Sequence, residues 1–373
     1  MNIFFNRIII SALFAFTVVL ACKKEVALRP GPPPPVDPPP ADTGFYSIKV
    51  RAEIRVGGIL YDSIPASLKI TAWDANGTAY YRNTQLAPGV NEVFLPKAQL
   101  RFRLELNKWG VHKDTIFTKQ EIREGAVYLL SAWKGAKQPK EEVTYTYIAG
   151  TYRPIAKQEF VYNATMLAEI KFFSIFLNGG TEVFQQTRSE KFIYQDKRLV
   201  KVVETYLIST GGESGERHYQ YDEHGRITRT IYIYPSQQFT YRNTYAQAGP
   251  MTVIDVYPEL QNNPLETRYQ FKIVKGNRVQ SKTLTNSGTY GYTYSYGFDI
   301  NPYAHINWPD IYFAHQSKNN HLTEHFFDGT QSAEETRFEY QVDADGYVTQ
   351  MIRKERDPFA STFLIISKKV FTY

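Results

Sequence analysis

Polar and apolar residues alternate along most of this chain, and the clearest case lies between residues 218 and 230. Tyr219 and Tyr221 occupy alternate positions, the turn sequence Asp222-x-x-Gly225 follows, and a second alternating run comes next. Alternation with period two, on both sides of residues that tolerate positive φ, predicts a β-hairpin.

Related stretches recur beyond about Val143, at spacings typical of a single supersecondary unit. They begin at Phe160, Phe192, Tyr219, Tyr269, Tyr292 and Phe338. A hairpin cannot bury its apolar face alone, so we expect neighbouring hairpins to lie side by side. Residues 141–373 are therefore predicted to form a multi-hairpin antiparallel meander, either a curved sheet or a partly closed barrel.

Residues 44–135 are predicted to form a smaller β domain. Its predicted strands are Tyr46–Val56, Leu68–Trp73, Val90–Leu95, Leu100–Leu106, Val111–Phe117 and Ala126–Ala132, with one helical turn at Lys119–Glu124. Short strands at this density indicate an Ig-like or prealbumin-like sandwich. We expect Trp73, Trp109 and Trp133 to pack in the core and at sheet edges; the alternative is a sugar-binding platform. A Gly-, Lys- and Pro-containing break follows at Lys134–Glu142.

Composition supports an all-β protein and argues against one class of partner. Aromatic residues make up 15% of the 373 residues, with 28 Tyr and 24 Phe, and these residues favour strands. The net charge of +6 arises from 43 basic and 37 acidic residues that are evenly spread. Without a basic block to neutralise a phosphate backbone, we expect no nucleic-acid partner.

The N-terminal residues predict export and a lipid anchor. Residues 1–21 combine an early Arg7 with a short apolar run, the layout of a secretory signal peptide. The sequence Val19-Leu20-Ala21-Cys22 resembles the lipobox of bacterial lipoproteins, and Cys22 is the only cysteine. The resemblance implies that Cys22 is acylated, for example with palmitate, and that the protein is an outer-membrane lipoprotein; a periplasmic or surface-facing position stays open. The proline-rich segment 22–43 favours an extended stalk.

The best hairpin also resembles a known repeat. Tyr219-x-Tyr221-Asp222-x-x-Gly225 is similar to the YD repeat of RHS-type proteins. The wider layout is similar to uncharacterised bacterial lipoproteins with diverged YD-like hairpins, in which an Asn-Pro-aromatic element and an Asn-Asn pair recur. Asn301-Pro302-Tyr303 and Asn319-Asn320 stand in those places here. The resemblance implies a fold and a location, and no activity.

Two segments match the beginning or the whole of a metal-binding motif, and we expect neither to bind metal. His321-Leu322-Thr323-Glu324-His325 matches a zinc motif that requires a helix, whereas its neighbours indicate a strand. On a strand, residues four apart lie about 13 Å from each other. Asp343-Ala344-Asp345-Gly346 starts like a calcium loop but lacks the later Glu, so it is predicted to be a turn. No cofactor is predicted.

The segment Gly297–Asn320 interrupts the hairpin rhythm and supplies the candidate ligand-binding residues. These are Tyr303, His305, Trp308, Asp310 and Tyr312. Aromatic faces beside hydrogen-bonding groups suit a sugar-sized ligand, and long loops of this kind are often functional. The alternative is a loop that covers a barrel mouth with its aromatic residues turned inward.

These observations lead to two functional hypotheses. The first is a non-catalytic binding or scaffolding module of the cell envelope, attached to the membrane by a lipid and recognising a glycan or an envelope protein. The second is a glycan-acting hydrolase, which would need a carboxylate pair about 5 to 10 Å apart. No sequence motif identifies such a pair.

Overall fold

The computed structural model describes residues 44–62, 64–208, 212–259, 267–306, 317–329, 331–356 and 362–373. These residues form strands and a single 3₁₀ turn, η1 (Lys119–Glu121), which confirms the all-β prediction and the short helical turn. The signal peptide, Cys22 and the proline-rich segment lie outside the described residues. Among the residues described, no helix has the length and apolar character needed to cross a membrane.

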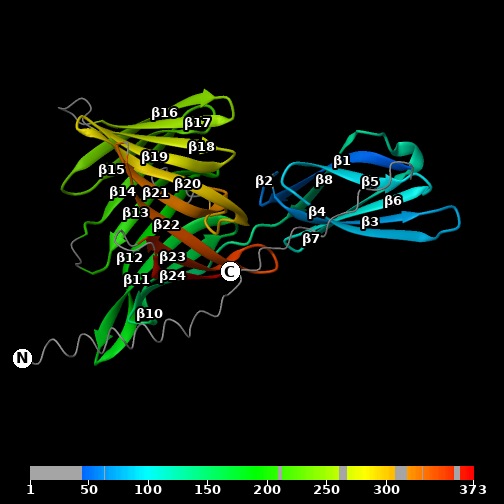
Figure 1. Ribbon diagram of the computed structural model, residues 1–373. Coiled ribbons are helices and arrows are strands. Elements are labelled where there is room, and N and C mark those ends of the chain that lie inside the picture. Colours follow the sequence, from blue (N-terminus) through cyan, green and yellow to red (C-terminus); the bar gives the residue numbers. More distant parts are fainter. Residues whose placement is uncertain are drawn as a thin grey trace, which may run out of the picture. The chain divides into compact units, whose positions relative to one another are not determined.

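The first part of the chain folds into two four-stranded sheets (Figure 1, blue to cyan). One sheet contains β1 (Phe45–Val56), β2 (Ile59–Tyr61), β5 (Val90–Pro96) and β8 (Val127–Lys134). The other contains β3 (Ala66–Trp73), β4 (Ala79–Leu86), β6 (Arg101–Lys108) and β7 (Val111–Thr118), in the order β4-β3-β6-β7. Each strand predicted for this region is present within a few residues of its expected bounds.

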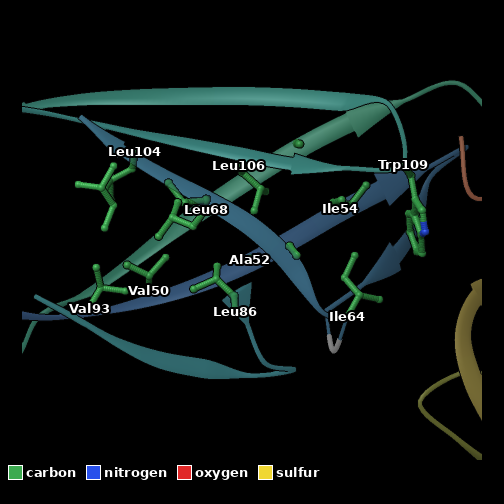
Figure 2. Close-up of a cluster of buried hydrophobic side chains, with 14 of the residues drawn as sticks. Val50, Ala52, Ile54, Ile64, Leu68, Leu86, Val93, Leu104, Leu106 and Trp109 are labelled. Atoms are coloured by element: carbon green, nitrogen blue, oxygen red, sulfur yellow. The ribbon is translucent and has the colours of Figure 1, made fainter. Parts of the chain in front are cut away.

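Alternate residues of these strands make the sandwich core. Figure 2 shows side chains such as Val50, Ile54, Leu68 and Leu104 gathered between the strands, each of them fully buried. Burying a side chain of this size contributes about 1.5–3 kcal/mol. Trp109 belongs to this core, as expected. Trp133 lies on the edge strand β8, where its ring is 70% exposed and contacts the Arg55 guanidinium.

The remaining strands form a closed antiparallel barrel of 16 strands (Figure 1, green to red). Its strands are β9 (Glu141–Ile148), β10 (Thr151–Asn163), β11 (Met166–Asn178), β12 (Thr181–Gln195), β13 (Arg198–Tyr206), β14 (Gly215–Tyr221), β15 (Ile227–Ile233), β16 (Gln238–Ala248), β17 (Met251–Glu259), β18 (Thr267–Val274), β19 (Asn277–Thr285), β20 (Gly288–Ile300), β21 (Asn319–Asp328), β22 (Gln331–Val342), β23 (Val348–Arg356) and β24 (Phe363–Thr372).

Each barrel strand pairs with its neighbours in sequence, and β24 pairs with β9 to close the ring. The closing register places Val143 opposite Val370 and Glu142 opposite Phe371. The expectation of a curved sheet or a partly closed barrel is therefore corrected to full closure. Each strand of this ring therefore has a paired neighbour on both sides.

The hairpin of β14 and β15 has the predicted turn. Asp222 Oδ1 accepts hydrogen bonds from the backbone N–H groups of His224 and Arg226, at 3.0 and 2.8 Å. Gly225 has φ of 75°, in the left-handed region that favours glycine. The turn between β22 and β23 repeats this geometry with Asp343 and Gly346, whose φ is 82°. Turn chemistry thus accounts for both Asp-x-x-Gly sequences.

The β22–β23 turn contacts residues of the sandwich and of the segment after it. Lys134 Nζ donates hydrogen bonds to the carbonyl oxygens of Trp109 and Asp345, at 2.7 and 2.9 Å. Lys137 Nζ lies 2.9 Å from Asp343 Oδ2 and 2.5 Å from Asp345 Oδ2. Tyr347 is fully buried in the same core cluster as Trp109. Residues predicted only to form a break therefore hold this turn in place.

Candidate functional site

The inner face of the barrel carries the aromatic residues of the hairpins. Residues paired across two strands point to the same face of the barrel. The partners of buried residues that point inward therefore also point inward. Inward residues include Phe160, Phe172, Tyr219, Tyr241, Phe271, Tyr294 and Phe338. The lumen, meaning the space enclosed by the barrel, is consequently walled by Tyr and Phe rings.

The outer face is charged. Every strand from β10 to β19 carries at least one charged outward residue. These residues are Lys157, Lys171, Lys191, Lys201, Glu216, Arg229, Arg242, Asp255, Arg268 and Lys282. Several form ion pairs on that face, such as Arg229 with Glu259 at 2.9 Å and Arg268 with Asp255 at 2.7 Å. Apolar outward residues, such as the partly exposed Ile193, lie between these charges.

One end of the lumen is filled by side chains. This end, which we call the turn end, is where the turns after β10, β12, β14 and β22 lie. Phe160, Leu167, Leu199 and Ile227 pack there into one buried cluster. Ile306, in the segment after β20, is fully buried in the same cluster, and Tyr303 packs against it. This described part of the predicted loop therefore lies inside the turn end of the barrel.

A cavity of about 140 Å³ lies in the lumen beside Tyr303. Its lining residues come from β21 to β24 and from the segment after β20. They are Asn301, Pro302, Tyr303, Asn320, His321, Glu324, Phe338, Tyr340, Met351, Lys369 and Phe371. The cavity thus combines a mainly apolar wall with a few ionisable groups, the usual make-up of a small-molecule site.

His321 faces this cavity because of a β-bulge. Between β20 and β21 the register steps from Ser295–Thr323 to Tyr296–His321, so Leu322 is an extra residue on β21. The bulge brings His321 to the same inner face as Glu324, and His321 Nδ1 lies 3.1 Å from Glu324 Oε1.

On its other side, the His321 ring reaches a tyrosine. His321 Nε2 lies 3.0 Å from the Tyr296 hydroxyl, which is 2.8 Å from Ser317 Oγ. Burial raises the pKa of Tyr296. The row of Glu324, His321, Tyr296 and Ser317 fixes the orientation of the imidazole inside the lumen.

The zinc motif does not form a zinc site in this fold. The predicted strand is confirmed, since β21 spans all five residues of the motif. His325 pairs with Thr293 on the outer face, so the barrel wall separates it from His321. Within the described part of the chain, no group of three or more His, Cys, Asp or Glu side chains could hold a metal ion.

A second ionic group lies at the cavity, where Tyr303 and Lys369 line its wall and Glu142 lies behind them. Glu142, which is 1% exposed, accepts a hydrogen bond from the Tyr303 hydroxyl. Lys369 Nζ lies 2.7 Å from Glu142 Oε1 and 3.3 Å from the Tyr303 hydroxyl. Burial and then the Glu142 charge raise the pKa of Tyr303. The Lys369 and Glu142 charges therefore balance each other.

The lumen also contains a carboxylate pair. Glu190 and Glu204 face each other across β12 and β13. Arg217 lies 2.7 Å from Glu190, and Arg188 lies 2.7 Å from Glu204. Burial raises the pKa of Glu190, opposed by the two arginines. Two carboxylates matched by two arginines form a compensated ionic network.

Two of the five candidate ligand-binding residues, Tyr303 and His305, lie within the described part of the chain. Tyr303 lines the cavity, whereas His305 lies beside the sandwich residue Gly57 and burial lowers the pKa of its imidazole to about 4. Trp308, Asp310 and Tyr312 lie outside the described residues, so their role in binding stays a prediction. Sequence reasoning dismissed His321 and Glu324 as zinc ligands and missed their common inward face. It also missed Glu142 and Lys369, which no local motif marks.

No protein-family model matches the chain, and no curated protein matches it in sequence. Several solved structures resemble part of it, among them two crystal structures of porin-like proteins. A porin-like protein from Bacteroides uniformis ATCC 8492 is 14% identical, with a TM-score of 0.46, over 63% of this chain and 97% of that one. A porin-like protein from Bacteroides vulgatus ATCC 8482 is 10% identical, with a TM-score of 0.35, over 62% and 97%. Likenesses this distant leave the function to be argued from the residues themselves.

Proposed function

We propose that this protein is a non-catalytic binding module of the bacterial cell envelope, attached to the outer membrane through a lipid on Cys22. The barrel stands in water beside the membrane, and its lumen is the binding chamber. One observation carries the proposal: the outer face of the barrel wall has at least one charged residue on every strand from β10 to β19.

A membrane-spanning barrel needs an apolar band on its outer face, because that face contacts lipid tails. A Lys or Arg on the lipid-facing side costs about 2–4 kcal/mol at the bilayer midplane and less near the interfaces. Outward charges on every strand from β10 to β19 would make that cost prohibitive. Attachment through Cys22 requires no lipid-facing strand.

The ionic groups of the lumen support binding over catalysis. A glycoside hydrolase needs one carboxylate to donate a proton and another to attack or activate water. Here Glu190 and Glu204 are each held by an arginine at 2.7 Å, so both carboxylates are already occupied by ion pairs. The hydrolase remains the second candidate because the pair exists. It predicts that Glu204→Gln abolishes a glycan-cleaving activity of the wild type.

Membrane fractionation tests the proposal. Cys22→Ser should prevent lipidation, and a Thr17→Ser control should leave it intact. Because an uncleaved signal peptide could itself retain the Cys22→Ser chain, a second variant replaces residues 1–22 with a signal peptide that is fully removed after export. We expect that variant in the soluble fraction, with the wild type in the membrane fraction after an alkaline carbonate wash. A variant that resists the wash without any lipid would show that the barrel inserts into the bilayer, and the proposal would fail.

A further inference from the structure

We propose that the cavity beside Tyr303 binds a small organic cation, an amine or quaternary ammonium group of about seven non-hydrogen atoms. This inference rests on the proposed role of the lumen as a binding chamber. It adds the chemical class of the ligand, which follows from the rings, the charges and the size of the cavity.

Aromatic rings form much of the cavity wall. Tyr303, Phe338, Tyr340 and Phe371 all line it. The Tyr303 and Phe371 rings meet edge to face, with centroids 5.7 Å apart. The faces of aromatic rings carry negative potential, and several rings around one space attract a desolvated cation. An aromatic wall of this kind is the usual receptor for ammonium groups.

The charge balance of the cavity leaves one carboxylate without a matching cation. Lys369 is matched by Glu142 at 2.7 Å. Among the described residues, Glu324 pairs with the His321 imidazole at 3.1 Å and forms no ion pair with a lysine or arginine. Counting the buried Glu142 behind Lys369, two carboxylates and one ammonium group stand at the cavity.

The surroundings of Tyr340 agree with this negative charge. Burial raises the pKa of the Tyr340 hydroxyl, and the neighbouring Glu324 and Asp299 carboxylates raise it further. Arg278 lies over the ring of Tyr294, 5.0 Å from its centroid, and does not line the cavity. The cavity therefore presents a negative potential to a ligand that enters from the lumen.

Size and access restrict the ligand. An apolar cavity of about 150 Å³ holds a molecule of the size of benzene, and this one measures about 140 Å³. The Glu324 side chain is 22% exposed, so a ligand in the lumen can reach its carboxylate. A compact trimethylammonium group fits these limits, with its positive charge beside Glu324 and its methyl groups against the rings.

The experiment compares choline with 3,3-dimethylbutan-1-ol, which has the same shape without the charge. Binding to the purified full chain in non-ionic detergent is measured by line broadening of the ligand methyl protons in NMR spectra. We expect choline to bind at least about tenfold more tightly than the neutral isostere. Glu324→Gln should weaken choline binding by about the same factor and leave the binding of the isostere unchanged.

Glu339→Gln is the matched control. Glu339 lies between Phe338 and Tyr340 in sequence but faces outward, where it pairs with Lys354. This variant removes the same charge from the other side of the wall, so choline binding should not change. Equal affinity for choline and its isostere, no detectable choline binding, or equal losses in both variants would each overturn the proposed cation site. None of these outcomes would affect the fractionation result, so failure here is distinguishable from failure of the proposed function.

Discussion

Alanine substitution at Gly225 and at Gly346 should have different costs, although both residues end the same kind of turn. Both have positive φ, 75° and 82°. Holding an L-residue in the left-handed region costs roughly 1–2 kcal/mol, and this cost applies equally to Gly225→Ala and Gly346→Ala. Any difference between the variants must therefore come from what surrounds each new methyl group.

At Gly225 the added Cβ would meet its nearest neighbouring atom, a guanidinium nitrogen of Arg198, at 3.7 Å, which is an ordinary contact. At Gly346 the Cβ would lie 2.1 Å from Cδ1 of Trp109 and 2.5 Å from two other atoms of the same indole. Either the buried indole or the turn must move, and overpacking of this kind adds typically about 1–3 kcal/mol. We therefore expect losses of roughly 1–2 kcal/mol for Gly225→Ala and roughly 2–5 kcal/mol for Gly346→Ala.

Urea unfolding of the full chain, followed by far-ultraviolet circular dichroism and tryptophan fluorescence, measures both losses. The same pair of substitutions is then made in a Trp109→Ala background, where the space beside Gly346 is open. There the two losses should become equal within about 0.5 kcal/mol. Equal losses already in the wild-type background, or an excess at Gly346 that persists without the indole, would refute the contact between Trp109 and the β22–β23 turn.

Further predictions concern the lumen and His305. Arg217→Leu should leave the buried Glu190 without its nearest cation and lower the free energy of unfolding by roughly 3–5 kcal/mol. Arg229→Leu, on the outer face, should lower it by about 1 kcal/mol or less. The midpoints of urea unfolding compare the two variants. The pKa of His305 is about 4 in the fold and 6.5 when unfolded, so the unfolded chain binds the extra proton between these values. Stability should therefore fall by up to about 3 kcal/mol as pH drops from 6.5 to 4, and His305→Gln should lack this loss in unfolding experiments at each pH.

Local sequence chemistry was enough to predict the hairpins. Asp222 and Gly225 are three residues apart, and their hydrogen bonds and backbone preference lie within the turn itself. Closure could not be predicted in the same way, because it depends on pairing Val143 with Val370 across most of the chain. Alternation shows that a strand has two faces, but strand number and register decide whether a sheet closes.

The site residues were harder to predict for a related reason. Strict alternation puts His321 and His325 on one face and Glu324 on the other. The extra residue Leu322 moves His321 to the same face as Glu324. A β-bulge of this kind cannot be recognised from a single sequence. The sequence left the exposure of Trp133 open, because an aromatic residue on an edge strand can face either the core or water.

The pairing of β9 with β24 also has a consequence for how the molecule assembles. Every other backbone pairing between barrel strands joins neighbours in sequence and can form as soon as both strands exist. The pairing of β9 with β24 can form only once β24 reaches β9, and until then both strands present unpaired edges. An interrupted or truncated chain would keep those edges and associate with other chains through them. Pairing of β9 with β24 is thus the folding step at which this barrel is most exposed to misassembly.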